Sequence, residues 1–395
     1  MRAPPAWLAT WLSAGLAVAL CLGGSAVVSL AIDLPEPDEF NVVRWELEHL
    51  PNKWLYLTGR LFGRDVSSEE GDERLVRYLD LTRRIGDLAA ADALGVDAIA
   101  RLRAEREEIE NDVEAVVEGR ITAVLEDAGL DSSLPLFPGV RWVFPPVDVE
   151  FGQPPAVLAV SRRDRIELVA RRPLRPGYSR EDAIAREQAL EADGDVSALV
   201  LGIGGAATYP SIVAPQDTYQ ELIDTVAHEW VHHYLFFKPL GRRILDSEEL
   251  RTLNETVANI AARDLAQLVM ARYPLPESAG HLQAPAPATI DVGAALRTLR
   301  LQVDALLAHG RIEEAEELME QARLGLAEQG VFFRRINQAY FAFQNVYADQ
   351  PASTDVLGDQ LLRLRERSGS VGGFLRAAGE LTSAKDLPEL LAGEP

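Results

Sequence analysis

Residues 226–232 read VAHEWVH and contain the pattern H-E-x-x-H. Because residues four positions apart lie on one face of an α-helix, His228 and His232 can both bind one metal ion if this stretch is helical. Thr218, with Glu221 three positions later, forms a capping box that predicts where the helix begins. An apolar stripe beside the histidine pair also favours a helix; it consists of Tyr219, Leu222, Ile223, Val226, Trp230 and Tyr234.

A second predicted helix supplies a third ligand. Asp246 with Glu249 is placed to cap this helix, and Glu255 lies within it, with 22 residues between it and His232. That spacing allows a turn and an antiparallel return. Catalytic zinc commonly takes three protein ligands with water in the fourth position, and two histidines with one glutamate are a known set. We therefore predict that Zn2+ binds to His228, His232 and Glu255.

Residues 218–262 resemble the gluzincins, the thermolysin-like class of zinc metallopeptidases. The resemblance rests on H-E-x-x-H and on the Asn-Glu pair at residues 254–255. In that class an acidic residue often follows the third ligand by four positions. Here that position holds Asn259, which we expect to hydrogen-bond a ligand histidine. The resemblance implies peptide hydrolysis with Glu229 as the general base. The metzincin class is excluded, because no glycine and third histidine follow the motif closely.

Two further residues bear on the site, Tyr340 and His233. Peptidases of this kind often use a tyrosine or histidine to stabilise the oxyanion, and Tyr340 is the candidate here. Its helical spacing with Phe333, Ile336 and Phe343 is, however, more typical of a core residue. His233 follows the ligand pair directly and points off its face, which favours a structural role.

The composition bounds the function classes. The chain has 395 residues, 47% of them hydrophobic, which indicates two or three compact units. A net charge of −22 argues against nucleic acid as a partner, because phosphate binding needs a concentrated basic face. Cys21 is the only cysteine, so neither an intrachain disulfide nor a cysteine-based zinc site can form.

The N-terminus predicts a membrane anchor. Residues 6–32 carry no charge and as a helix would extend about 40 Å, more than the ~30 Å of a bilayer's hydrocarbon core. Arg2 precedes this run and acidic residues follow it, so we expect a single pass with a cytoplasmic N-terminus and an extracytoplasmic catalytic domain. Alternatively, Ser29-Leu30-Ala31 is a signal-peptide cleavage site, which would give a secreted form.

The remaining chain divides by composition. Residues 72–130 predict a helical hairpin or stalk, and residues 291–381 are predicted to be mainly helical. A proline-rich stretch at 134–155 excludes a regular helix there, and the four prolines at 274–287 indicate a connector. Short apolar runs predict strands, the first two joined in a hairpin; they are 156–160, 166–170, 198–203 and 209–214.

We therefore expect an α+β fold, in which a zincin-like catalytic domain with a small sheet and two motif helices lies between mainly helical regions. The predicted parts are 1–33, the transmembrane anchor; 34–133, a juxtamembrane segment and helical stalk; 134–274, the catalytic domain; and 275–395, a C-terminal helical domain. The expected function is a membrane-anchored zinc-dependent peptidase acting on a peptide or protein substrate. Two alternatives stay open: a non-catalytic membrane-anchored binding or scaffold protein that retains the zincin fold, and a helical interaction protein with a chance motif.

Overall fold

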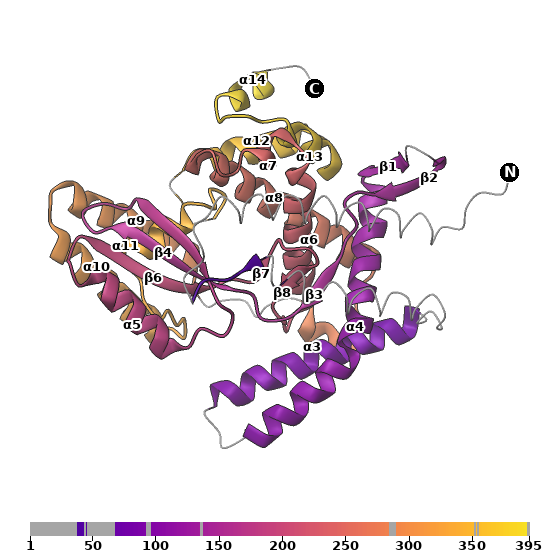
Figure 1. Ribbon diagram of the computed structural model, residues 1–395, viewed down its shortest axis with the longest axis horizontal. Coiled ribbons are helices and arrows are strands. Elements are labelled where there is room, and N and C mark those ends of the chain that lie inside the picture. The colour runs from indigo at the N-terminus through magenta and orange to yellow at the C-terminus, as the bar shows by residue number, and fades with distance from the viewer. Residues whose placement is uncertain are drawn as a thin grey trace.

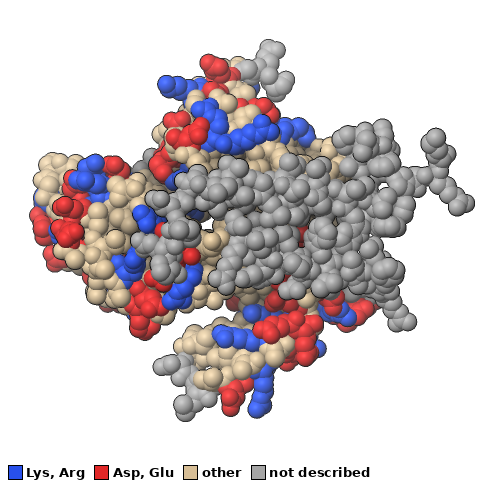
Figure 2. Space-filling view, in the orientation of Figure 1, with Lys and Arg blue, Asp and Glu red and all other residues tan. Residues whose placement is uncertain are grey.

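The computed structural model describes residues 38–42, 45, 68–91, 96–134, 137–283, 290–350, 353 and 355–392. Within these ranges the chain is an α+β protein with small sheets and mainly helical flanks, as the sequence predicted. Figure 1 shows two parts lying side by side. We call them the sheet lobe, formed within residues 156–202 and 292–344, and the helical lobe, formed within residues 68–127, 219–272 and 357–392. Acidic and basic side chains are intermixed over the described surface of both lobes on the face seen in Figure 2.

The sheet lobe is built on an antiparallel sheet of order β5-β4-β6. Side chains alternate across the central strand, because successive residues of a strand face opposite sides. Val157 and Ala159 pack against α9, α10 and α11, whereas Leu158 and Val160 pack on the side of α5. The predicted hairpin and third strand are thus confirmed. The elements are β4 (Ala156–Arg162), β5 (Leu168–Leu174), β6 (Val196–Gly202), α5 (Arg180–Glu191), α9 (Val292–Ala308), α10 (Ile312–Glu328) and α11 (Gln338–Gln344).

The helical lobe has the two motif helices at its centre. These are α6 (Tyr219–Phe236) and α8 (Glu248–Arg272), joined by the short α7 (Pro239–Arg242), and they pack against each other. The predicted N-terminal hairpin packs on one side, and the C-terminal helices on another (Figure 1). These are α3 (Ser68–Ala90), α4 (Val96–Asp127), α12 (Leu357–Arg367), α13 (Val371–Gly379) and α14 (Asp386–Ala392).

A small sheet of order β3-β8-β7 leads into α6. Strand β8 pairs in parallel with β3 and antiparallel with β7, and it lies within the run predicted as a strand at 209–214. A separate hairpin, β1-β2, precedes this sheet. The bounds are β1 (Asp131–Leu134), β2 (Phe137–Val143), β3 (Val149–Phe151), β7 (Gly205–Ala206) and β8 (Ser211–Val213).

One apolar core runs through the whole helical lobe. It includes Leu75 of α3, Val117 of α4, Trp230 of α6, Leu253 of α8 and Phe374 of α13, all almost fully buried. The packing therefore crosses the boundaries predicted at residues 133 and 274. The N-terminal hairpin is in this respect not a free stalk, because the C-terminal half of α4 is buried in the same core as the motif helices.

A segment from the N-terminal side extends the sheet lobe. Residues 38–40 pair with the end of β5: the amide of Phe40 donates to the carbonyl of Pro173 at 3.1 Å, and the amide of Arg175 donates to the carbonyl of Asp38 at 2.8 Å. Strand β5 is therefore held by β4 along one side and by this segment at its C-terminal end.

The membrane prediction is corrected. The anchor expected at residues 1–33 lies outside the described residues, and no helix that the structure describes is long and apolar enough to cross a bilayer. The 32-residue α4 is long enough, but charged side chains occur along its whole length. The prediction of a single-pass membrane protein, with its cytoplasmic N-terminus and extracytoplasmic catalytic domain, is therefore withdrawn.

Candidate metal centre

Helix α6 begins as predicted and is fixed in rotation. The amide of Glu221 donates to the hydroxyl of Thr218 at 3.3 Å, and this hydroxyl donates to the Glu221 carboxylate at 2.9 Å. The indole of Trp230 donates to the carbonyl of Pro145 at 2.8 Å. His233 is buried, and its Nε2 donates to the carbonyl of Thr208 at 2.8 Å. These contacts fix the faces of α6 that do not carry the ligand pair. His228 and His232 therefore point toward α8.

The predicted start of α8 is wrong by one residue. Ser247 is the N-cap, and its hydroxyl accepts from the amide of Leu250 at 3.2 Å. Asp246 instead accepts from Arg243 at 2.9 Å. Serine and aspartate are about equally good N-caps, so the sequence alone does not show whether Asp246 or Ser247 caps the helix. The shift leaves Glu255 in the second turn of the helix, facing α6.

The three predicted ligands converge. Their candidate ligand atoms lie within 4.8 Å of one another. The Nε2 atoms of His228 and His232 are 3.0 Å apart, and Oε2 of Glu255 lies 3.5 Å from the first and 3.3 Å from the second. All three side chains are at most 17% exposed. Two imidazole nitrogens and one carboxylate oxygen thus face a single point, where one metal ion can bind.

The electrostatics of the cluster favour a cation at that point. Burial lowers the pKa of His232, but the charge of Glu255 and its hydrogen bond to the ring raise it to about 9. Burial raises the pKa of Glu255, but the positive charge on His232 and hydrogen bonds from both histidines hold it well below its usual range. A buried carboxylate that keeps its charge between two imidazoles is the environment in which a bound cation is stabilised.

A hydrogen bond outside the cluster orients one ligand. Nδ1 of His232 donates to Oδ1 of Asn254 at 2.7 Å, so Nε2 is the nitrogen that coordinates once a metal displaces its proton. Asn259, predicted for this role, donates instead to Asp349 at 3.2 Å. The prediction was wrong because a residue four positions after Glu255 lies one turn along α8, beside the segment that follows α11. Asn254 adjoins Glu255 and faces α6.

Glu229 lies buried beneath the edge of the small sheet. It is 6% exposed, and burial raises its pKa. Gly205 of β7 passes directly over its carboxyl group: a Cβ added there would lie 2.8 Å from Cγ and Cδ of Glu229 and closer still to Oε1. Only a glycine leaves room for the Glu229 side chain in this position.

The tyrosine that interacts electrostatically with the cluster is Tyr347 and not the predicted Tyr340. Tyr340 packs edge-on against Phe333 and Phe341 in the core of the sheet lobe, and burial alone raises its pKa to about 12. Tyr347 lies one turn beyond Phe343. Burial raises the pKa of Tyr347, the charges of Glu255 and Glu229 raise it further, and Arg171 opposes them. The hydroxyl of Tyr347 therefore belongs to the electrostatic surroundings of the site and stays protonated.

Sequence reasoning also missed Arg171. This residue of β5 reaches from the sheet lobe to Oε1 of Glu255, at 3.4 Å. Its guanidinium group lies 5.4 Å from the centre of the Phe343 ring. The sequence carries a weak signal, a pair of arginines within an otherwise apolar strand run, but nothing in it connects Arg171 to a glutamate 84 positions later.

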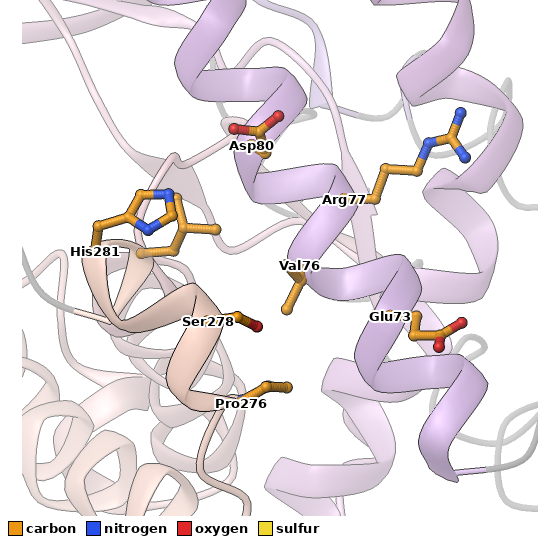
Figure 3. A pocket seen from close by; sticks show the side chains of 8 residues that line it. Glu73, Val76, Arg77, Asp80, Pro276, Ser278 and His281 are labelled. Carbon is orange, nitrogen blue, oxygen red and sulfur yellow. The ribbon is translucent and has the colours of Figure 1, made fainter.

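A separate cavity of about 360 Å³ lies between α3 and the short 3₁₀ helix η1 (Glu277–Leu282). Figure 3 shows Arg77 and Asp80 on α3 and His281 on the opposite wall. None of its lining residues belongs to the metal cluster, so this cavity is not part of the candidate site.

Comparison of the chain with protein-family models, curated proteins and solved structures finds no match.

Proposed function

We propose that this protein is a zinc-dependent peptidase of the kind that the gluzincin resemblance implies. The observation that supports the proposal is the convergence of His228, His232 and Glu255 on one point, with Glu229 between the two histidines in sequence and buried under β7. The H-E-x-x-H motif accounts only for the two histidines on one face of α6. The third ligand, Glu255, comes from a second helix, α8, which the motif does not specify.

The donor set fits zinc. Two imidazole nitrogens with one carboxylate oxygen form a known catalytic zinc set and leave a coordination position for water or substrate. Magnesium and calcium prefer sites made of oxygen ligands. The hydrogen bond from His232 to Asn254 orients the ring as zinc ligands are usually oriented.

The surrounding residues supply the rest of the proposed chemistry. When bound, zinc supplies a Lewis acid that polarises a peptide carbonyl and acidifies water. Glu229 accepts a proton from the water that attacks the carbonyl carbon, and delivers it to the nitrogen as the carbon–nitrogen bond breaks. The raised pKa of Glu229 suits both steps, because a group whose pKa lies closer to neutral pH can both accept and release a proton. Tyr347, which stays protonated, donates a hydrogen bond to the developing oxyanion.

Zinc content tests the metal centre. The purified protein is expected to contain about one zinc ion per chain, because the cluster offers one three-ligand set. His232→Ala removes one ligand and should lose most of this zinc. His309→Ala is the matched control, since His309 is exposed at the end of α9. Elemental analysis of untagged protein measures all three. Equal zinc in wild type and His232→Ala would show that the cluster is not the metal site.

Turnover separates a peptidase from a binding protein. Zinc-loaded wild type is expected to cleave members of a broad peptide library, detected by mass spectrometry of the products. Zinc bound at full occupancy without any cleavage would contradict the proposed activity, and would favour a non-catalytic protein that retains the metal site.

Gly205→Ala is expected to slow cleavage by between about tenfold and 10²-fold without loss of zinc. The added methyl group must displace the Glu229 carboxyl group, and a displacement on the order of 1 Å at a catalytic group has an effect of this size. Gly204→Ala is the matched control, because a Cβ there meets its nearest atoms at an ordinary 3.7 Å. Equal rates for the two variants would show that Gly205 does not position the base.

A further inference from the structure

The two oxygens of Glu255 face different partners. Oε2 faces the two ligand histidines at 3.5 and 3.3 Å, whereas Oε1 faces a terminal nitrogen of Arg171 at 3.4 Å. The histidines come from α6 in the helical lobe, and Arg171 comes from β5 in the sheet lobe. The carboxylate is therefore held between two lobes, with one oxygen directed to each.

Arg171 is itself held on several sides. Its side chain is 24% exposed, and its guanidinium group lies over the ring of Phe343. Its strand is paired with β4, and residues 38–40 join the end of β5 beyond it. A guanidinium group fixed in this way can restrain the rotation of the carboxylate that it contacts, because a charge-assisted hydrogen bond is directional.

We propose that Arg171 is a positioning residue that makes Glu255 a ligand through one oxygen only. This inference rests on the proposed metal centre. With Oε1 held by Arg171, only Oε2 of Glu255 faces the metal. The protein then supplies three coordination bonds, two from histidines and one from Glu255, and does not supply a fourth. The position left open is the one that water or a substrate carbonyl needs.

The positive charge of Arg171 distinguishes this role from simple support of a ligand. The bound metal is a cation, and the positive guanidinium group beside it repels it. The charge of Arg171 therefore does not increase the metal affinity of the site. Its removal is therefore expected to alter the coordination number while the metal still binds. A residue that only supported the fold would change neither the number nor the type of coordinating atoms.

Cobalt(II) is the probe for coordination number, because four-coordinate cobalt absorbs visible light more strongly than five-coordinate cobalt. Metal-free wild type, Arg171→Met and Arg172→Met are loaded with one equivalent of cobalt. Methionine keeps an unbranched apolar side chain against Phe343 but has no donor. Arg172 is the matched control: it is the next residue along β5, its side chain is 53% exposed, and it pairs with Glu39 at 3.3 Å instead of with the cluster.

Wild type and Arg172→Met are expected to show the strong four-coordinate spectrum. Arg171→Met should bind the same amount of cobalt with a loss of absorption intensity, as the second oxygen of Glu255 joins the metal. X-ray absorption of the zinc-loaded proteins should show the matching gain of one oxygen neighbour. Should Arg171→Met fail to fold, Arg171→Ala carries the same expectation.

Identical spectra for wild type and a folded Arg171 variant would overturn the positioning role alone, with the metal centre intact. No cobalt or zinc bound by the wild type would overturn this inference together with the proposed function. The two failures are thus distinguishable, and neither readout depends on finding a substrate.

Discussion

The Glu229→Gln protein is expected to hold as much zinc as the wild type and to cleave peptides about 10²–10⁴-fold more slowly. Glu229 is not one of the three converging ligands, so the substitution leaves the metal-binding atoms unchanged. Glutamine has the same size and fits under Gly205, but it cannot accept a proton. Initial rates at equal, measured zinc content would give the difference.

Glu255→Gln is the control for this result. It weakens a ligand, so zinc occupancy and cleavage are expected to fall together. The contrast separates loss of a base from loss of the metal. Equal rates for wild type and Glu229→Gln at matched zinc content would remove Glu229 from the mechanism.

Tyr347→Phe is expected to lower the rate of cleavage by about 10²–10³-fold, with zinc content unchanged. The substitution removes only the hydroxyl group, which shares its electrostatic surroundings with Glu255, Glu229 and Arg171. Because an oxyanion donor acts mainly in the transition state, the loss should lie in kcat and not in KM.

Tyr340→Phe provides the matched comparison for Tyr347→Phe. Its ring lies in the apolar core of the sheet lobe between Phe333 and Phe341, so the rate should stay within about twofold of the wild type if the hydroxyl takes no part in the reaction. A large loss of kcat in Tyr340→Phe, with none in Tyr347→Phe, would restore the donor that the sequence suggested.

The local parts of the site could be predicted from the sequence because they depend on short spacings. The interval of four between the histidines, the cap at Thr218 and the return to Glu255 all follow from helix geometry within about forty residues. The strands observed at 156–162, 168–174 and 196–202 were likewise predicted, with somewhat different ends, from short apolar runs at 156–160, 166–170 and 198–203.

The residues around the ligands could not be predicted because other lobes and turns bring them there. The side chain of Arg171 reaches Glu255 from β5, Gly205 of β7 lies against the Glu229 side chain, and Tyr347 follows α11. Each of these contacts joins segments that are far apart in the sequence. Which asparagine bonds to His232, Asn254 or Asn259, depends on how α8 is rotated relative to α6. Spacing along one helix does not define that rotation. The N-terminal prediction used the length of an uncharged run and the charges beside it, and the described helices did not support it.

The shared core of the helical lobe has a consequence for any attempt to shorten the chain. A fragment of residues 134–274 would keep all three metal ligands, yet it would expose the apolar faces that α3 and α4 cover on one side and α12 to α14 on the other. Such a fragment is expected to aggregate instead of folding, because large apolar patches are left open to solvent. Residues 134–274 are therefore not expected to fold alone, and expression trials or gene fusions that aim to retain the metal ligands need the described chain from α3 through α14.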